Sequence, residues 1–467
     1  MKHEINMKTK RKLVVLVFIL SQLIILQLSG MSSTSKFGVM ESKLFSVEVN
    51  GQKVWTEDYV SNLEFEKLPD WFIAPYVREH QRMHIASFEG EGNLEFVITL
   101  DETPKNVRLR PMDRGITPVV EENKIMFSSN KVGQLVLEVD SLPPLYLFIN
   151  PKEENIPLKD DKNVIYFEPG IHEAGYIELK DNHTVYIAEG AIVYGGIRAN
   201  GANNIKVIGR GILDGDYRFN NIVLLENSSN IHFEGVIIRN SISWTNTLVN
   251  CRNVNYDNVK VLGFGPSSDG INPAGSQNVT IKNCFIRCTD DCIAIKAPNP
   301  DHPIKDILVE NCVLIGYAYA DGVTIGFETN AEYVKDVIVR NCDILLARGG
   351  SRVDGHSGFS IICDGPATIS NIIFDNIRVE ESELKLFELH ITDGTKYGEG
   401  PAGNIQDIII KNVKWYHEGP IIILGHNENN RVENVTFENC TVAGRKLVEV
   451  KNKVLILNSF TSNIEIK

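Results

Sequence analysis

A short pattern of apolar and polar positions recurs along most of the chain. Each copy has alternating apolar residues, one variable polar residue, an Asn or Gly, and a second apolar pair, as in VTIKNCFI, ILVENCVL and VIVRNCDI. Alternation and β-branched residues predict strands, and no helical period lies between the copies. The Asn or Gly recurs 23 to 36 residues apart, at Gly209, Gly235, Asn258, Asn283, Asn311, Asn341, Asn376, Asn412 and Asn439.

This repeat predicts a parallel β-helix in which each copy forms one coil stacked on the previous coil. A period in the twenties with one strong strand per unit is typical of such solenoids. Strands of neighbouring coils would then lie about 4.8 Å apart. We expect the recurring Asn at a bend, where its side chain can bond the backbone of the Asn in the next coil. The alternative, an antiparallel sandwich, would need hairpin turns at shorter intervals.

The segment before the repeats has a different sequence pattern. Between Phe45 and Pro151, apolar alternating runs such as LEFVITL, KIMFSS and LYLFINP follow one another at intervals typical of a β-sandwich. The polar stretch Pro151–Asn163 is typical of a linker. The chain is therefore predicted to be all-β, with a small β-sandwich domain at 45–151 and a right-handed parallel β-helix domain at 164–467.

The N-terminus carries the pattern of an export signal. Basic residues at positions 8–12 precede the apolar run Leu13–Leu28, and small residues follow in SGMSSTS. The run is short for a membrane span, and Ser21 and Gln22 interrupt it. We expect residues 1–30 to be a cleaved signal peptide, with an uncleaved anchor as the alternative. The predicted location is secreted or periplasmic, with no membrane association beyond export.

The charge balance limits the partners that the protein can have. The formal net charge is −13, and loss of residues 1–30, with five basic residues and one acidic residue, would lower it to −17. An acidic chain is a poor partner for nucleic acid or for an anionic membrane. The same balance argues weakly against a polyanionic substrate, although a local basic groove could override it.

Eight cysteines in an exported chain suggest disulfides, but their positions favour another role for most of them. Five follow an Asn inside an apolar strand pattern, where a thiol behaves as a small buried hydrophobe: Cys251, Cys284, Cys312, Cys342 and Cys440. Cys288 and Cys292 could form a bridge, although so short a loop constrains its geometry.

Two adjacent carboxylates interrupt the apolar stretch FIRCTDDCIAIK at Phe285–Lys296. In a regular strand, one of Asp290 and Asp291 would face the core, where an unpaired carboxylate is very costly. Asp269, in SSDGINP, precedes Asp290 by 21 residues, close to one coil. The three carboxylates should therefore share one patch, in which like charges raise the pKa of one of them. A proton donor beside an ionised base is what glycoside hydrolysis requires.

Two other interpretations of the three aspartates remain open. Aspartates in turns often cap the backbone or simply face solvent. Clustered carboxylate oxygens are also the ligands that Ca²⁺ prefers.

At these residues the chain resembles the polygalacturonase family, glycoside hydrolase family 28 of the pectin-lyase-like fold. SDGIN and CTDDCIAIK carry the resemblance, and it extends over ISWTNTLVNCRNV and DGVTIGFETNAEYVKDVIVRNCDIL to cover most of 164–380. The three aspartates and the leading sandwich are also similar to dextranase family 49. The resemblance implies that Asp290 is the general acid, that Asp269 and Asp291 activate water, and that configuration is inverted. It implies neither a cofactor nor a metal.

The chain departs from the family pattern at two places. The family's Gly-His-Gly is Ala320-Asp321-Gly322 here, so that Asp321 could hold a sugar hydroxyl, raise the pKa of the acid, or merely begin a turn. The family's Arg-Ile-Lys, which grips a uronate, is Ser360-Ile361-Ile362. Arg352 and His356 lie nearby and could compensate, or could belong to a solvated loop.

Together these features predict a secreted glycoside hydrolase that cleaves a polysaccharide or oligosaccharide at a neutral sugar. Trp244 is a candidate for stacking on a sugar face, as are Tyr317, Tyr319 and Phe327, although each could instead belong to the core. No nucleic-acid partner is expected. The alternatives are a β-helix polysaccharide lyase, which would need a Lys or Arg base and usually calcium, and a non-catalytic glycan-binding protein.

Overall fold

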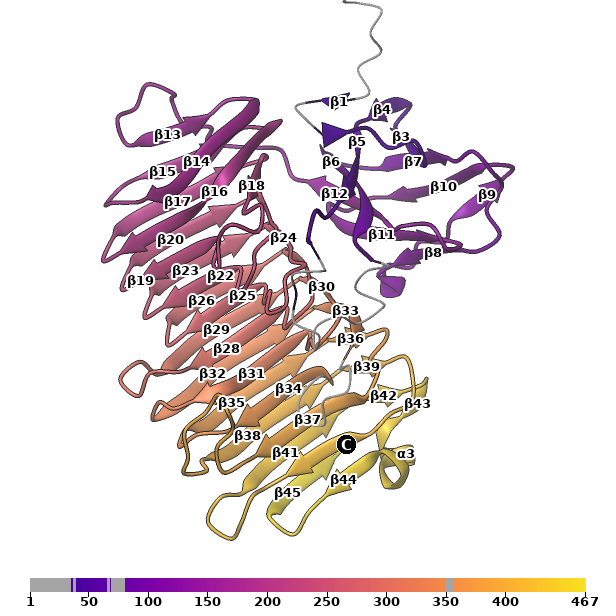
Figure 1. The fold of residues 1–467 in the computed structure, drawn as a ribbon. Coiled ribbons are helices and arrows are strands. Elements are labelled where there is room, and N and C mark those ends of the chain that lie inside the picture. Colours follow the sequence, from indigo (N-terminus) through magenta and orange to yellow (C-terminus); the bar gives the residue numbers. More distant parts are fainter. Residues whose placement is uncertain (1–34, 37–38, 65–67, 69–79, 349–356) are drawn as a thin grey trace, which may run out of the picture.

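The computed structural model describes residues 35–36, 39–64, 68, 80–348 and 357–467. Residues 1–30, expected to be a signal peptide, lie outside this part of the chain, as do Arg352 and His356. In the described residues a two-sheet body stands beside a long stack of coils (Figure 1). A short antiparallel pair, β1 (Ser35–Lys36) and β2 (Val39–Met40), precedes them.

The first body is a β-sandwich of two five-stranded sheets that enclose an apolar cluster. One sheet has the order β4-β3-β7-β10-β9, with β3 (Ser46–Val49), β4 (Gln52–Val54), β7 (Leu94–Thr99), β9 (Val119–Glu121) and β10 (Lys124–Ser129). The other has the order β5-β6-β12-β11-β8, with β5 (Thr56–Val60), β6 (Arg82–Glu89), β8 (Val107–Arg110), β11 (Gly133–Val139) and β12 (Leu145–Asn150). A 3-10 turn, η3 (Met112–Arg114), follows β8.

The second body is a right-handed parallel β-helix, as predicted, and its strands form three columns. Each coil runs from a first-column strand through a bend to a second-column strand, and then through a turn to a third-column strand. The first column is a 12-stranded sheet of β13 (Val164–Phe167), β15 (Thr184–Ile187), β17 (Asn203–Gly209), β20 (Ser229–Glu234), β23 (Arg252–Asp257), β26 (Gln277–Lys282), β29 (Ile304–Glu310), β32 (Tyr333–Arg340), β35 (Thr368–Asp375), β38 (Asn404–Lys411), β41 (Val432–Glu438) and β45 (Thr461–Ile466).

The second and third columns join in one larger sheet that begins with β14 (Gly170–Glu178) and β16 (Ala191–Asn200). The second column contains β18 (Ile212–Asp214), β21 (Ile237–Arg239), β24 (Lys260–Leu262), β27 (Phe285–Cys288), β30 (Val313–Gly316), β33 (Asp343–Ala347), β36 (Arg378–Val379), β39 (Lys414–Trp415), β42 (Thr441–Val442) and β43 (Arg445–Lys446). The third contains β19 (Val223–Glu226), β22 (Asn246–Val249), β25 (Ile271–Ala274), β28 (Ile293–Ala297), β31 (Val323–Thr329), β34 (Ser357–Cys363), β37 (Lys385–Ile391), β40 (Ile421–Leu424) and β44 (Leu455–Leu457). Among the described residues, the helix α3 (Leu447–Val454) lies near the C-terminus.

The recurring asparagines lie at the bends between the first and second columns. Asn283 and Asn311 both have a φ of 56°, in the left-handed region that Asn tolerates better than most residues. The expectation that each side chain bonds the backbone of the next Asn is wrong at these positions, because the amides bond one another. Asn311 Nδ2 donates to Asn283 Oδ1 at 3.4 Å, and Asn376 Nδ2 donates to Asn341 Oδ1 at 2.8 Å.

The interior of the coils is a continuous apolar stack, and the five predicted core cysteines belong to it. Rings of successive coils stack directly, as Phe233 and Tyr256 do, with centroids 4.4 Å apart. All eight cysteines are free and buried. The possible bridge between Cys288 and Cys292 is therefore not formed.

The sandwich packs on the second column, where an apolar cluster joins the two bodies. Strand β12 is buried along its whole length because one face fills the sandwich and the other meets the helix. Buried ion pairs cross the same boundary: Arg110 Nε donates to Glu380 Oε2 at 2.6 Å, and Arg239 Nη1 donates to Glu57 Oε1 at 2.9 Å. Turns between the second and third columns contribute Phe264 and Tyr317 to this apolar cluster.

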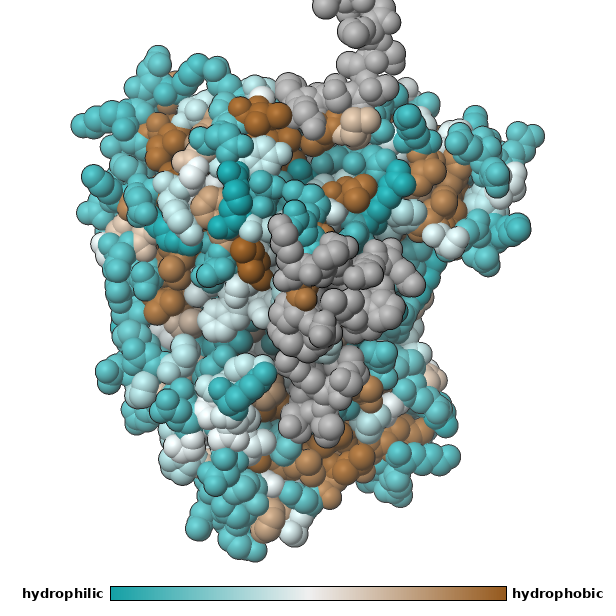
Figure 2. All heavy atoms as spheres, viewed as in Figure 1, coloured by the Kyte–Doolittle hydropathy of each residue, from teal (hydrophilic) through white to brown (hydrophobic). Residues whose placement is uncertain are grey.

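The visible outer surface is mainly hydrophilic, with scattered apolar patches (Figure 2). No helix in the described part of the chain has the length and apolar character needed to span a bilayer.

Candidate active site

Carboxylates of three successive coils stand in register where the third-column strands begin. Strand pairing aligns Ile271 with Ile293 and Ile293 with Val323, so that Asp269, Asp291 and Asp321 occupy equivalent positions. The backbone bonds agree, since Gly270 N–H donates to Asp291 O at 2.9 Å and Cys292 N–H donates to Asp321 O at 3.0 Å. The partner of Asp269 in the register is therefore Asp291, and not Asp290 as the spacing had predicted.

The adjacent aspartates avoid the core because the strand is interrupted. Strand β27 ends at Cys288 and β28 begins at Ile293, so that Asp290 and Asp291 lie in a turn. Asp290 is partly exposed, and its Oδ1 accepts a bond from the N–H of Asp291 at 3.1 Å. Asp291 is 8% exposed, and its Oδ1 accepts a bond from the N–H of Asp321 at 2.8 Å. Both carboxylates thus point away from the apolar stack.

Asp269 is a buried carboxylate that is held by a cation and an amide. It is 2% exposed. Asn272 Nδ2 donates to its Oδ2 at 3.2 Å, and Lys296 Nζ lies 3.4 Å from the same oxygen. Burial raises the pKa of Asp269 to about 6, while the charge of Lys296 works in the opposite direction. The group can therefore be ionised near neutral pH.

Lys296 is a site residue that the sequence reasoning missed. Its ammonium lies 3.2 Å from Glu328 Oε2 and 4.3 Å from the centre of the Trp244 ring. Burial alone would lower the pKa of Lys296, but the carboxylates of Asp269 and Glu328 raise it above its usual value. The sequence could have predicted this position. Ile293 and Ile295 fill the core, so the alternation of CIAIK places Lys296 on the outer face with the aspartates.

Asp291 and Asp321 are buried in a cluster of like charges. Burial raises the pKa of Asp291 well above its usual value, and Asp290, Asp321 and Asp269 raise it further. Burial also raises the pKa of Asp321 to about 7, against bonds from the next coil. Those bonds come from the Ser357 N–H and the Ser360 hydroxyl, one to each carboxylate oxygen. The Asp321 carboxylate, 2% exposed, is thus turned toward that coil.

The candidate stacking residues have different environments. Trp244 is half-buried under Lys296, and Phe327 is half-buried with its ring 5.6 Å from that of Tyr397. Tyr317 belongs to the apolar cluster between the sandwich and the helix. Tyr319 is 9% exposed. Of the four, only Trp244 and Phe327 are left half-buried.

The described cations around the site are engaged by other groups of the protein. Arg287 is fully buried, with its guanidinium 4.1 Å from the ring centres of both Phe264 and Tyr317. It donates to the carbonyl oxygens of Gly263 and His80 at 3.0 and 2.8 Å. Lys385 pairs with Glu388 at 2.5 Å.

At Ser360 and Ile362, where the family has Arg and Lys, this chain has uncharged side chains. The Ser360 hydroxyl lies 2.9 Å from that of Thr324, in addition to its bond to Asp321, and Ile362 is fully buried. Within the described ranges, no group of three or more His, Cys, Asp or Glu side chains is arranged to hold a metal ion.

Solved structures confirm the expected fold. Dex49A from Penicillium minioluteum aligns with a TM-score of 0.64 and 15% identity, covering 93% of this chain and 95% of that one. A hyperthermoactive exopolygalacturonase from Thermotoga maritima aligns with a TM-score of 0.53 and 18% identity, covering 65% of this chain and 84% of that one. At these identities the likeness concerns the fold alone.

Sequence comparison gives the family. Exopolygalacturonase B of Aspergillus niger is 23% identical over 248 residues, which are 46% of this chain and 54% of the relative. A probable exopolygalacturonase B of Aspergillus terreus is 29% identical over 222 residues, 44% of this chain and 48% of the relative. The chain thus spans about half the length of the curated relatives that it matches. The model of glycosyl hydrolases family 28 matches residues 157–455, which include the whole carboxylate cluster, and the chain belongs to this family.

Proposed function

We propose that the protein hydrolyses O-glycosidic bonds of a polysaccharide or oligosaccharide by an inverting acid–base mechanism. The observation that carries the proposal is the pair of buried carboxylates, Asp269 and Asp291, in register on neighbouring coils with the partly exposed Asp290 beside them. Neighbouring strands are about 4.8 Å apart, so the three groups can share protons within one patch.

The exposure and the charge environment of the three aspartates suggest which is the acid and which is the base. A general acid must come within hydrogen-bond reach of the leaving oxygen, and Asp290 is the most exposed of the three aspartates. Asp269, with a pKa of about 6 and an ammonium beside it, is suited to accept a proton from water. Asp291 would share that water. Direct displacement of the leaving group by a water that a base activates gives inversion of configuration.

The charges around the cluster favour a neutral sugar at the cleaved bond. Lys296 already serves two carboxylates, Asp269 and Glu328. Ser360 and Ile362 supply no charge where the family has Arg and Lys. The cations described at the site, Lys296, Arg287 and Lys385, are all engaged by other groups of the protein, and recognition of a uronate depends on charge-assisted bonds.

A galacturonan is the second candidate substrate. It is favoured by the relatives, several of which are exopolygalacturonases by name.

The proposal also includes export from the cell, supported by the apolar run Leu13–Leu28 behind a basic segment. The division into domains at 45–151 and 164–467 is supported by separate apolar clusters in the two parts.

The test is a screen for reducing sugars released from neutral and acidic polysaccharides, with Asp290→Asn as the inactive control. Release that depends on Asp290 supports hydrolysis. A product that absorbs in the ultraviolet through a new double bond would indicate a lyase instead. Glycan binding without release of reducing ends would indicate a non-catalytic protein.

A further inference from the structure

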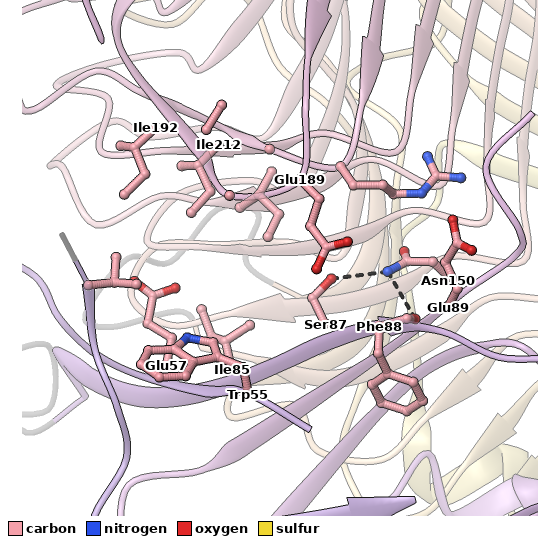
Figure 3. A pocket seen from close by; sticks show the side chains of 16 residues that line it. Trp55, Glu57, Ile85, Ser87, Phe88, Glu89, Asn150, Glu189, Ile192 and Ile212 are labelled. Carbon is pink, nitrogen blue, oxygen red and sulfur yellow. Dashed lines mark hydrogen bonds between the residues drawn. The ribbon is translucent and has the colours of Figure 1, made fainter. Parts of the chain in front are cut away.

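A cavity lies between the sandwich and the first coils of the helix, apart from the carboxylate cluster (Figure 3). We call it the junction pocket. Its volume is about 100 Å³, room for several water molecules. It is lined by Val39, Trp55, Glu57, Ile85, Ser87, Phe88, Glu89, Asn150, Glu189, Gly190, Ala191, Ile192, Arg210, Gly211, Ile212 and Ile237.

The junction pocket has an apolar part and a polar part. The half-buried indole of Trp55 lies near Ile85 on the sandwich side, and Ile192 and Ile212 lie across from them on the helix (Figure 3). In the polar part, the Glu189 carboxylate points toward the Ser87 hydroxyl (Figure 3). An apolar surface with a few convergent polar groups is the usual construction of a small-molecule site.

Most polar groups of the pocket already serve the fold. Glu57 bonds Arg239 at 2.9 Å, and Glu89 Oε1 accepts a bond from the N–H of Glu153 at 2.7 Å. Asn150 Nδ2 donates to Ser87 Oγ at 3.0 Å. These groups shape the pocket, and Ser87 keeps a hydroxyl hydrogen that it can donate.

One group is not used in this way. Glu189 is exposed, and its carboxylate has no hydrogen bond or ion pair among the described residues. The Arg210 side chain is 5% exposed and serves the fold: Nη2 lies 3.7 Å from Glu234 Oε1, and Nε is buried with almost no surface that solvent can reach. The other two nitrogens of this guanidinium donate to the carbonyl oxygens of Gly209 and Pro151, both at 3.2 Å.

We propose that the junction pocket binds one neutral pyranose unit of the polysaccharide without cleaving it. The proposal rests on the proposed function for its source of glycan. An indole face and isoleucines suit the C–H surface of a sugar ring. The Glu189 carboxylate can accept bonds from two vicinal hydroxyls, and the Ser87 hydroxyl can donate to a third. Glu57 is compensated by Arg239, and the remaining carboxylates, Glu89 and Glu189, would repel an anionic sugar.

The position of the pocket suits a holding site for a polymer. Ile212 and Ile237 belong to β18 and β21, whereas the catalytic aspartates follow β24 and β27. One to three coils correspond to roughly 5–15 Å along the helix axis at about 4.8 Å per coil. Binding of one part of a polymer there raises the effective concentration of the rest at the carboxylates.

The direct test uses the Asp290→Asn protein, in which glycan is not consumed. The probes are methyl α-D-glucopyranoside, methyl α-D-galactopyranoside and galacturonate. The readout is the NMR signal of the Trp55 indole N–H, assigned by its loss in Trp55→Phe, because this signal reports the junction pocket and not the cleavage site. We expect a saturable shift with at least one methyl glycoside, and a weaker effect of galacturonate.

The matched variants are Glu189→Ala and, as a control, Glu121→Ala, which changes an exposed glutamate on the far sheet of the sandwich. Glu189→Ala should weaken binding at least fivefold, and Glu121→Ala should leave it unchanged. With Asp290 intact, Glu189→Ala should slow hydrolysis of the polymer and leave that of short oligosaccharides within about twofold.

The proposal is overturned if neither methyl glycoside shifts the Trp55 signal, if galacturonate binds more tightly than both, or if Glu189→Ala has no effect on binding. These results are independent of the proposed function. Hydrolysis without a Trp55 shift would refute the pocket alone. A shift of the Trp55 signal in a protein that hydrolyses no glycan would refute the proposed function and leave the proposal for the junction pocket standing.

Discussion

The ammonium of Lys296 lies 3.4 Å from the carboxylate of Asp269, and both side chains are nearly enclosed by the protein. An opposite charge within about 4–6 Å lowers a carboxyl pKa by roughly one to three units. Here it acts against burial, which by itself would drive Asp269 further toward the protonated form. Lys296 thus keeps the proposed base ionised.

The first prediction concerns Lys296→Met. Asp269 must be ionised to accept a proton, so activity should fall as the pH drops through its pKa of about 6. Without the ammonium this pKa rises, and the acidic limb of the kcat/KM profile should move to higher pH by about one unit or more. Lys296→Arg keeps the charge and should leave the limb in place. A loss that is equal at every pH would mean that Lys296 only supports the structure.

The second prediction concerns Asp290→Asn. An amide cannot protonate the leaving oxygen, and general acid catalysis is typically worth about 100-fold or more in rate. We expect at least this loss in kcat on the best substrate of the screen. The melting temperature should change little, because relief of the repulsion by Asp291 offsets the lost bonds. Retention of more than a tenth of the turnover would remove Asp290 from the acid role.

The third prediction concerns the cost of burying Asp321. Its pKa rises from 3.8 to about 7 on folding. Between these values the folded state binds more protons than the unfolded state, so the free energy of unfolding decreases as the pH rises. A shift of about three units at about 1.4 kcal/mol each gives a cost of up to about 4 kcal/mol above pH 7.

Asp321→Asn removes this cost and keeps an oxygen for the bond from the Ser357 N–H. The variant should therefore gain stability relative to the parent as the pH is raised from 5 to 8, in urea unfolding at each pH. Asp301→Asn, at an exposed loop position, is the matched control. An identical pH dependence in Asp321→Asn and the parent would contradict the prediction.

The fourth prediction concerns the boundary between the two bodies. The side chains of Arg110 and Glu380 are 5% and 1% exposed, and they bond at 2.6 Å. Arg110→Met leaves Glu380 as a buried carboxylate without its main partner, a change that typically costs about 3–5 kcal/mol. Urea unfolding should show this loss, and Glu380→Gln added to Arg110→Met should recover part of it. No recovery would mean that packing of Arg110, and not its charge, stabilises the boundary.

The sequence predicted the fold well because the fold is repetitive. Each coil repeats an alternating strand and an Asn that can adopt a left-handed bend, and β13 begins at the predicted Val164. The bonds that the asparagines form were not predicted correctly, since the amides of Asn311 and Asn283 bond each other instead of the backbone. Spacing places a residue on a bend but does not orient its side chain.

The site was predicted only in part, for a related reason. A spacing of one coil could not distinguish Asp290 from Asp291 as the partner of Asp269, because the register depends on the turn that the two residues form. Glu328 reaches Lys296 from a residue with a φ of 56°, which no strand pattern indicates. Tyr317 proved to be an interface residue, because it packs in the apolar cluster between the sandwich and the helix.

The last prediction concerns the substrate. Two charge-assisted contacts of the family are absent at Ser360 and Ile362, and each is worth roughly 1.5–3 kcal/mol. Polygalacturonate should therefore be cleaved at least about 100-fold less efficiently than the best neutral α-linked glucan or galactan, as compared by kcat/KM.

The variant Glu328→Gln gives a second test of this substrate preference, because it leaves Lys296 paired with Asp269 alone. This variant should raise the activity on polygalacturonate relative to that on the neutral glycan, whereas the exposed Glu121→Gln should not. If the parent protein cleaves polygalacturonate fastest, the argument for a neutral sugar is wrong, and Arg352 and His356 become the residues to replace.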